Sequence, residues 1–252
     1  MPKDRVEFGT QAAGKLGKAA TEIRFLLDRG YEIKQSVTFV GNHYLLSERQ
    51  RMALTRILSP SDWVKRRLAK EWKKVNGPVR IDGFNLMITL EVALSGSLLL
   101  EGDDGTIRDL AGLRGTYQIV DKTERAAELI FSFLADLGVQ DAIFYLDQPV
   151  SNSGRLKTLL LEKAQGFPVH VTAEVVPNPD RILWGKEGVI TSDAIILNEC
   201  VTWYNLARRI IESAIPQAWI FHLPPETKPQ RQFAAEENRN PSAADLEASG
   251  LV

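Results

Sequence analysis

The spacing of apolar residues along the chain changes at Asn76–Gly77–Pro78, and no other sequence feature constrains the fold as much. Upstream, apolar residues recur at the period of amphipathic helices, which we expect over 9–29, from Ser47 and from about Asp62. Glycine and proline together stop a helix. Downstream, short apolar runs alternate with helical stretches, a pattern typical of a mostly parallel sheet with helices on both faces.

This change in the spacing of apolar residues, together with composition, predicts three regions: a small basic all-helical domain over 1–76, an α/β domain over 77–223 and a disordered tail over 224–252. The tail holds four of the twelve prolines and few large apolar residues. The strands are expected at 79–82, 97–101, 106–108, 142–146, 170–175, 189–191 and 218–222. The later helices are expected at 85–94, 123–137, 153–164 and 203–214. In the helical domain, 38–44 is expected to be a polar-aromatic loop, and an apolar stripe with Trp63, Leu68 and Trp72 is expected in the core.

The composition is that of a globular protein: 252 residues, 44% apolar and 25% charged. The chain has no uncharged apolar run of the roughly eighteen residues that span a bilayer, so no membrane contact is expected. Its first residues lack the apolar segment of a signal peptide, which favours a cytoplasmic location. One cysteine, Cys200, and three scattered histidines argue against a disulfide, a thiolate zinc cluster and a paired-histidine zinc motif.

Charge is spread unevenly along the chain. Residues 1–75 hold 16 Lys and Arg against 8 Asp and Glu, a net charge of +8, whereas 76–252 hold 15 against 24, a net charge of −9. A basic region of this kind is suited to a polyanion such as RNA, although solvated helix faces explain it equally well. The residues expected to contact RNA are Arg49, Arg51, Lys65, Arg66, Lys70, Lys73 and Lys74. Phe39, His43 and Tyr44 are suited either to stack on bases or to pack between domains.

An aspartate follows each of three apolar strands: Asp82, Asp147 and Asp193. The carboxyl ends of parallel strands lie on one edge of a sheet, where ligands bind. Aspartates gathered there repel one another, and a hard divalent cation with oxygen ligands removes that conflict. The alternative is that each aspartate merely caps the helix that follows it.

The motifs around these aspartates resemble those of a known superfamily. Asp-Gly-Phe-Asn at 82–85, Asp147 followed by Ser-Asn-Ser-Gly at 151–154, and Thr-Ser-Asp at 191–193 are similar to motifs of PIN-like nucleases, particularly the NYN branch. The resemblance covers roughly 78–215. The whole arrangement resembles a conserved family of uncharacterised proteins in which a small helical domain precedes a PIN-like domain.

The resemblance implies a three-layer α/β/α ribonuclease fold that uses Mg²⁺ or Mn²⁺. Asp82, Asp147 and Asp193 would then be catalytic metal ligands, and Asn85 would order the loop around the first of them. A further acid would come from Glu91, Asp104 or Asp109, of which Asp109 is preferred. Glu91 is also consistent with an exposed helix position, and Asp104 with the turn of a hairpin.

Further residues near these motifs are expected to support the aspartate site. Ser151, Ser153 and Arg155 open a helix whose free N–H groups are suited to hold a phosphate, unless the serines simply cap it. Thr191 and Ser192 adjoin the last aspartate.

The function expected from these residues is metal-dependent hydrolysis of RNA. The alternative is a non-catalytic RNA-binding or assembly protein on a degenerate scaffold, because Ile195 stands where many relatives carry a further aspartate. A phosphohydrolase of the haloacid-dehalogenase type needs a second aspartate where this chain has Phe84. The sequence leaves open the substrate RNA, the number of metal ions and the oligomeric state, a homo-oligomer included.

Overall fold

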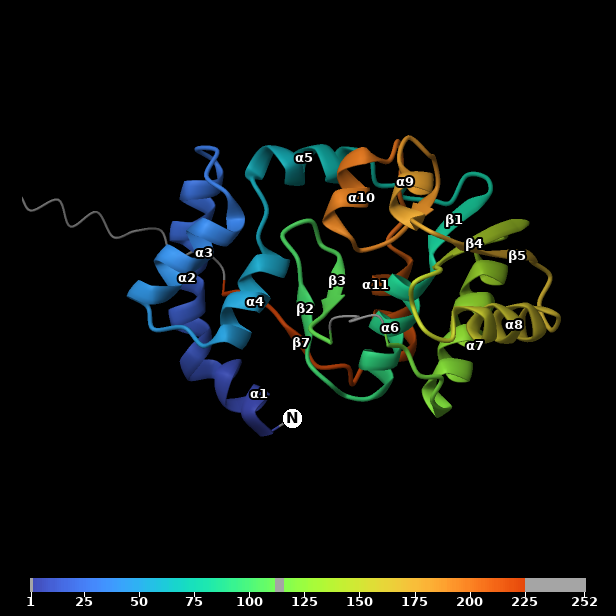
Figure 1. Ribbon diagram of the computed structural model, residues 1–252, viewed down its shortest axis with the longest axis horizontal. Coiled ribbons are helices and arrows are strands. Elements are labelled where there is room, and N and C mark those ends of the chain that lie inside the picture. Colours follow the sequence, from blue (N-terminus) through green and yellow to red (C-terminus); the bar gives the residue numbers. More distant parts are fainter. Residues whose placement is uncertain (1, 112–115, 225–252) are drawn as a thin grey trace, which may run out of the picture.

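The computed structural model describes residues 2–111 and 116–224. The tail expected over 224–252 therefore lies outside the described residues except for Pro224. Figure 1 shows an elongated molecule, with the N-terminal helices at one end and a parallel sheet at the other. Within the described residues, we find no helix with both the length and the apolar character that a membrane span requires.

The N-terminal region consists of helices. They are α1 (Pro2–Glu7), α2 (Thr10–Leu27), α3 (Ile33–His43), α4 (Glu48–Ile57) and α5 (Ser61–Ala69). Ser47 caps α4 as predicted, because its hydroxyl accepts a hydrogen bond from the backbone of Gln50, whose side chain bonds back to the Ser47 N–H. The predicted loop over 38–44 is wrong, since most of it lies in α3. Val37 and Val40, three residues apart, give that helix its buried face.

α5 faces the opposite way from the prediction. Trp63 and Leu68 were expected in the core but are 36% and 43% exposed, whereas Arg67 on the same helix is buried. The guanidinium of Arg67 forms an ion pair with the buried Asp104, and this contact holds the side of the helix that carries Arg67 inward. Trp72, beyond the helix, is partly buried against the main core, as expected.

The second region contains a four-stranded sheet with strand order β5–β4–β1–β6. Its strands are β1 (Val79–Asp82), β4 (Asp141–Asp147), β5 (His170–Val176) and β6 (Val189–Ile190). Every pairing in this sheet is parallel, so the carboxyl ends of all its strands lie on one edge. All four strands fall where the alternating pattern predicts them.

Helices cover both faces of this sheet (Figure 1). On one side lie α6 (Gly83–Leu94), α7 (Asp121–Asp136), α8 (Ser153–Ala164) and α11 (Leu206–Ala214), and on the other α9 (Pro179–Leu183) and α10 (Ala194–Glu199). β4 shows the alternation behind this arrangement. Ala142, Phe144 and Leu146 belong to the core that α6, α7 and α8 complete, whereas Ile143 and Tyr145 pack with α9 and α10. The predicted α/β class, with three layers and a helical N-terminal region, is confirmed.

A second sheet lies between the N-terminal helices and the parallel sheet (Figure 1). It has the order β3–β2–β7, formed by β3 (Ile107–Asp109), β2 (Leu99–Glu101) and β7 (Ile220–Phe221). The predicted hairpin is present as the antiparallel β2–β3 pair, and β7 joins β2 in parallel. The sequence pattern indicates one sheet, whereas the structure has two. Leu100 and Phe221 of the second sheet share a core with Leu16 and Leu54 of the helices, so packing continues across the predicted boundary near residue 76.

Candidate active site

Five aspartates line one cavity at the carboxyl edge of the parallel sheet. Asp82 and Asp147 end β1 and β4, and Asp193 lies at the start of α10. Asp109 of β3 and Asp180 of α9 line the same cavity, whose volume is about 570 Å³. The structure thus brings together the three aspartates that the sequence singled out, together with Asp109.

The N-terminal helices contribute part of the cavity lining. Ile33 of α3, Thr55 and Arg56 of α4, and Leu58 face it beside Arg108 of β3. The cavity therefore lies between the helical region and the α/β region. Two arginines and five aspartates share it, so it can hold both cations and anionic groups.

Asp180 is the cavity residue that sequence reasoning missed. It lies in the first turn of α9, which begins with Pro179 after the cap residue Asn178; the Asn178 side chain accepts a hydrogen bond from the Arg181 N–H. A capping residue followed by proline is a helix-start signal, and it comes two residues after β5 ends. The same strand-end argument that found the other aspartates would therefore have found Asp180, had this short helix been recognised.

Asp82 is placed by a close contact between α6 and β4. A Cβ atom at Gly83 would lie 2.5 Å from the Leu146 side chain and 3.0 Å from the Tyr145 carbonyl oxygen, so only glycine fits there. Asp82 occupies the cap position of α6 but makes no side-chain capping bond. Instead, the Thr191 hydroxyl donates a 2.8 Å hydrogen bond to Asp82 Oδ2. For Asp82, the simple capping alternative does not apply.

The carboxylates of the cavity perturb one another. Burial, with added repulsion from Asp193, Asp147 and Asp180, raises the pKa of Asp82 to about 8, although the Thr191 bond opposes this shift. Burial and the charge of Asp180 raise the pKa of Asp147, and burial and the charge of Asp193 raise that of Asp180. Perturbed carboxylates gathered in one cleft are typical of functional sites.

Hydrogen bonds fix the loop that carries Asp193. Its Oδ1 caps α10 by accepting from the Ile195 and Ile196 N–H groups at 2.7 and 3.2 Å. Its own N–H donates to the Thr191 hydroxyl at 3.0 Å. Asn85 Oδ1 accepts from both the N–H and the hydroxyl of Ser192, at 2.8 and 3.0 Å. Asp193 is therefore both a helix cap and a cavity residue, and Asn85 ties α6 to the loop.

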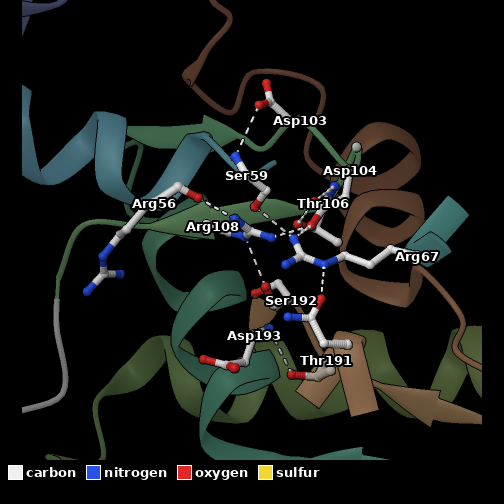
Figure 2. A network of polar contacts seen from close by, with 12 residues as sticks. Arg56, Ser59, Arg67, Asp103, Asp104, Thr106, Arg108, Thr191, Ser192 and Asp193 are labelled. Atoms are coloured by element: carbon white, nitrogen blue, oxygen red, sulfur yellow. Dashed lines mark hydrogen bonds and ion pairs between the residues drawn. The ribbon is translucent and has the colours of Figure 1, made fainter. Parts of the chain in front are cut away.

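A buried ionic network supports the same loop from behind (Figure 2). Arg108 Nε donates to the Ser192 carbonyl oxygen at 2.9 Å, and its Nη2 bonds to Asp104 at 2.5 Å. Arg67 from α5 donates to the same Asp104 oxygen at 2.7 Å and to Asn198 of α10 at 2.7 Å. Burial opposes ionisation, but the two arginines hold the pKa of Asp104 below its usual value. Asp104, a candidate cavity acid, does not line the cavity; it joins three segments of the chain.

Asp109 is the additional acid that the structure places in the cavity. Its Oδ1 accepts a 2.7 Å hydrogen bond from the Ala111 N–H and lies 3.5 Å from Arg56 Nη1. The Arg56 side chain also donates to the Asp109 carbonyl oxygen at 2.5 Å. Asp109 and Arg56 thus form an ion pair at the wall where the second sheet meets α4.

Glu91 and Ser151 lie outside the cavity and hold another segment. Glu91 accepts hydrogen bonds from the hydroxyls of Tyr117 and Thr123, both at 2.5 Å. The Ser151 hydroxyl accepts from the Tyr117 N–H at 2.9 Å. These contacts anchor the chain before α7, so Glu91 is neither the exposed residue nor the cavity acid considered from the sequence.

The expected phosphate-binding turn before α8 is also separate from the aspartates. The cap residue of α8 is Asn152, in the left-handed conformation (φ 62°), and it makes no side-chain capping bond. Ser153 is buried and Arg155 exposed, and neither lines the aspartate cavity. Capping by either serine does not occur, because the cap position belongs to Asn152.

The cationic residues expected to contact RNA divide into two groups. Three of them bond within the protein. Arg49 pairs with the buried Asp4, and Arg51 donates to the Leu46 carbonyl oxygen at 3.0 Å. Lys70 donates to the carbonyl oxygens of Asn198 in α10 and of Cys200, which follows this helix. The other four, Lys65, Arg66, Lys73 and Lys74, are exposed, and of these Lys65 pairs with Asp62 and Lys73 with Glu71 at the surface.

The carboxylates do not form a closed metal cage. Within residues 2–111 and 116–224, no three His, Cys, Asp or Glu side chains are grouped so that they could together hold a metal ion. A cation at this edge of the sheet would therefore need water or a bound ligand to complete its coordination.

Fold and site define a class of protein: an α/β sandwich with aspartates at the carboxyl edge of its parallel sheet, preceded by helices that line the same cavity. The chain belongs to the family described as "Domain of unknown function (DUF5616)", whose model matches residues 73–209. A second model, "Protein of unknown function (DUF434)", matches residues 15–70. An uncharacterised protein of Methanocaldococcus jannaschii is 34% identical over 183 residues, which cover 71% of this chain and 88% of that protein. No solved structure matches the chain significantly.

Proposed function

We propose that this protein is a ribonuclease that uses a divalent cation to hydrolyse phosphodiester bonds in the aspartate cavity. One observation carries the proposal: Asp82, Asp147, Asp180 and Asp193 line one cavity, and the buried Asp82 has a pKa of about 8. Repulsion of this kind costs folding free energy, and a bound cation offsets it. The likeness of the motifs to PIN-like nucleases favours RNA as the substrate. A cytoplasmic location, which the sequence favours, is part of the proposal.

The donor set fits Mg²⁺ or Mn²⁺ better than a metal that needs a full protein cage. Mg²⁺ keeps several of its waters and binds through one or two carboxylates together with substrate phosphates. The absence of a three-residue cage among the described residues is compatible with such a site. Asp82 and Asp147, at the ends of adjacent strands, would hold the ion, with Asp180 and Asp193 beside them.

Bound there, the cation would supply an activated water and neutralise charge on the phosphate. The protein residues orient and balance these groups. Thr191 holds Asp82 Oδ2 in place, and the capping bonds of Asp193 fix its carboxylate relative to α10. Arg56, whose side chain is 32% exposed, lines the cavity and is suited to attract a phosphate that the aspartates alone would repel. Arg108 adds only its charge there, because each of its side-chain nitrogens donates within the protein.

Cleavage of labelled RNA in Mn²⁺, in Mg²⁺ and in EDTA tests the proposal. Asp82→Asn keeps an acceptor for Thr191, and Asp193→Asn keeps a helix cap, so both variants remove charge with little structural change. We expect metal-dependent cleavage that both variants lose, and a melting temperature that Mn²⁺ raises more in the wild type than in Asp82→Asn. The control is Asp136→Asn, an exposed carboxylate at the end of α7. Undiminished cleavage by Asp82→Asn would refute the mechanism.

A second function is a non-catalytic RNA-binding protein on the same scaffold. The observation that favours it is Ile195, an apolar residue that lines the cavity and is largely exposed. This function predicts RNA binding that weakens steeply with salt and needs no metal. Binding that stays constant between low and moderate salt would count against it.

A further inference from the structure

One face of α5 is not packed into the protein core. Its Trp63 and Leu68 side chains are turned to solvent, whereas Arg67 is buried in the ionic network with Asp104. A helix at a protein surface normally buries its apolar residues and exposes its charges. The Arg67 contacts fix the rotation of α5 about its axis. The same contacts therefore keep Trp63 at the surface. Exposed apolar groups that border polar residues commonly mark interaction sites.

Trp63 lies in a groove between α5 and the turn that joins α2 to α3. The groove has a volume of about 850 Å³, and its lining includes Tyr31, Trp63, Lys65 and Arg66. Tyr31 is 57% exposed. The Arg66 guanidinium lies over the Trp63 ring, 5.3 Å from its centroid. The groove thus presents two aromatic side chains and two cationic side chains to solvent.

The groove adjoins the aspartate cavity. Ile33 at the start of α3 lines both, so the two hollows meet at this residue. Most of the groove lining comes from the basic part of the chain and most of the cavity lining from the acidic part. The charged side chains of the groove itself balance: Lys65, Arg66 and Arg67 against Asp28, Glu32 and Asp62. Figure 1 shows α5 extending from the N-terminal helices to α10, the helix that begins at Asp193.

We propose that this groove binds single-stranded RNA, with bases stacked on Tyr31 and Trp63 and phosphates at Lys65 and Arg66. This inference rests on the proposed function, because it makes the groove the path of the substrate strand beside the cleavage site. Aromatic faces accept bases only when those bases are unpaired, which selects single strands over duplexes. A peptide would use the aromatic residues equally well, but it offers no phosphates for the paired cations.

Three acidic residues also line the groove: Asp28, Asp62 and the exposed Glu32 at the start of α3. Two of them bond within the protein. Both Asp28 oxygens accept hydrogen bonds from Ser61, at 2.7 Å from its N–H and 2.8 Å from its hydroxyl, so Asp28 joins the end of α2 to α5. Asp62 lies 3.7 Å from Lys65 in an exposed pair, and such pairs contribute little and break readily. Lys65 is therefore available to a phosphate.

The test is RNA binding by the full chain carrying Asp82→Asn, which prevents cleavage. The probe is a fluorescein-labelled 12-nucleotide single-stranded RNA in Mg²⁺, followed by fluorescence anisotropy. Adding Trp63→Ala or Tyr31→Ala should raise the Kd about tenfold. Lys65→Ala with Arg66→Ala should weaken binding and lower the salt dependence by about two ions. In the parent, RNA should quench tryptophan fluorescence, and Trp63→Phe should abolish most of that quenching.

Matched controls separate the groove from general charge and aromatic effects. Phe25→Ala removes an exposed aromatic residue that lines neither the groove nor the aspartate cavity, and Lys122→Ala with Arg125→Ala removes two exposed cations of α7. Both should leave the Kd unchanged. The inference is overturned if the groove variants change the Kd no more than these controls, if a duplex of the same sequence binds equally well, or if the parent does not bind RNA.

The same variants distinguish this inference from the proposed function. If the chain with Asp82 intact cleaves RNA and the groove variants cleave and bind like it, the groove inference fails while the nuclease stands. If the groove variants lose binding and the chain with Asp82 intact cleaves nothing, the groove inference stands while the nuclease fails.

Discussion

At the scale of single residues, burial and nearby negative charges both destabilise the ionised form of Asp82. Its side chain is buried, with 7% of its surface exposed, and the charges of Asp193, Asp147 and Asp180 act on it. One hydrogen bond from Thr191 does not compensate for lost solvation and nearby negative charge. A residue that destabilises the metal-free fold in this way is consistent with a binding role, because selection for stability alone would remove it.

The pH dependence of stability follows from this burial. The pKa of Asp82 is about 8 in the folded protein against 3.8 for an ordinary aspartate, so the folded state holds its proton more tightly. Its contribution to stability is complete below pH 4 and is lost as pH rises toward 8. In EDTA, Asp82→Asn should therefore stabilise the protein by roughly 1–3 kcal/mol at pH 8 and by almost nothing at pH 4.

Urea denaturation at the two pH values measures this difference, with Asp136→Asn as the exposed control. An Asp82→Asn variant that is equally stable to the wild type at pH 8 would show that the carboxylate is not strained.

Gly83 gives a second residue-scale prediction. In Gly83→Ala the new Cβ would meet Leu146 at 2.5 Å, so α6 must move away from β4. We expect a loss of about 1–3 kcal/mol in the free energy of unfolding. Gly154→Ala in α8 is the matched control, because nothing lies within 4 Å of its Cβ position and alanine favours a helix. Equal stability of the two variants in urea would contradict the predicted close packing.

The sequence could predict which aspartates follow strands, but it could not predict every aspartate that lines the cavity. Asp82 and Asp147 were found because an apolar run precedes each of them. Asp180 was missed because a short helix start hides it. Asp104 lies in the hairpin turn, as the alternative for it predicts, but its burial between two arginines has no local signal. Long-range ion pairs such as Arg67 with Asp104 join residues that are 37 positions apart. The local sequence pattern around each residue therefore does not indicate its ion-pair partner.

At the scale of elements, α5 depends on one buried charge. Arg67 bonds to Asp104, to the Ser59 hydroxyl at 2.9 Å and to Asn198 at 2.7 Å, so a single side chain connects the helix to three other segments. The Arg67 carbonyl oxygen also accepts a 2.7 Å hydrogen bond from the Trp203 indole. Periodicity assigned α5 an apolar inner face, but these polar contacts decided its rotation.

Arg67→Met should therefore be strongly destabilising. It removes a buried charge and leaves Asp104 with Arg108 as its remaining ionic partner, at an expected cost of about 3–5 kcal/mol. Arg66→Met, one residue earlier and exposed, should change stability by less than about 0.5 kcal/mol. Thermal unfolding of the two variants measures the contrast. Similar melting temperatures would mean that the network does not hold α5.

At the scale of the whole molecule, the helical region shares a hydrophobic core with the second sheet of the α/β region. The core of the helices is completed by Leu98, Leu100, Leu110 and Phe221 from beyond the predicted boundary. The ion pair of Arg24 with Asp103, 2.6 Å long, crosses the same junction. Composition predicted a boundary near residue 76, because charge and periodicity both change there. It could not predict the shared core, since the contact depends on where the second sheet lies in space.

One cooperative unfolding transition is therefore expected for the described part of the chain. Leu54→Ala in α4 and Leu134→Ala in α7 each remove a fully buried side chain, one from the core of the helices and one from the main core. Each should cost about 2–5 kcal/mol, and each should shift the urea midpoints by circular dichroism and by tryptophan fluorescence together. Independent domains would instead give two transitions, with each variant moving only its own. The aspartate cavity lies where the N-terminal helices meet the α/β region. If the two regions unfold together, a destabilising substitution in the helices would also reduce the fraction of molecules with an intact cavity.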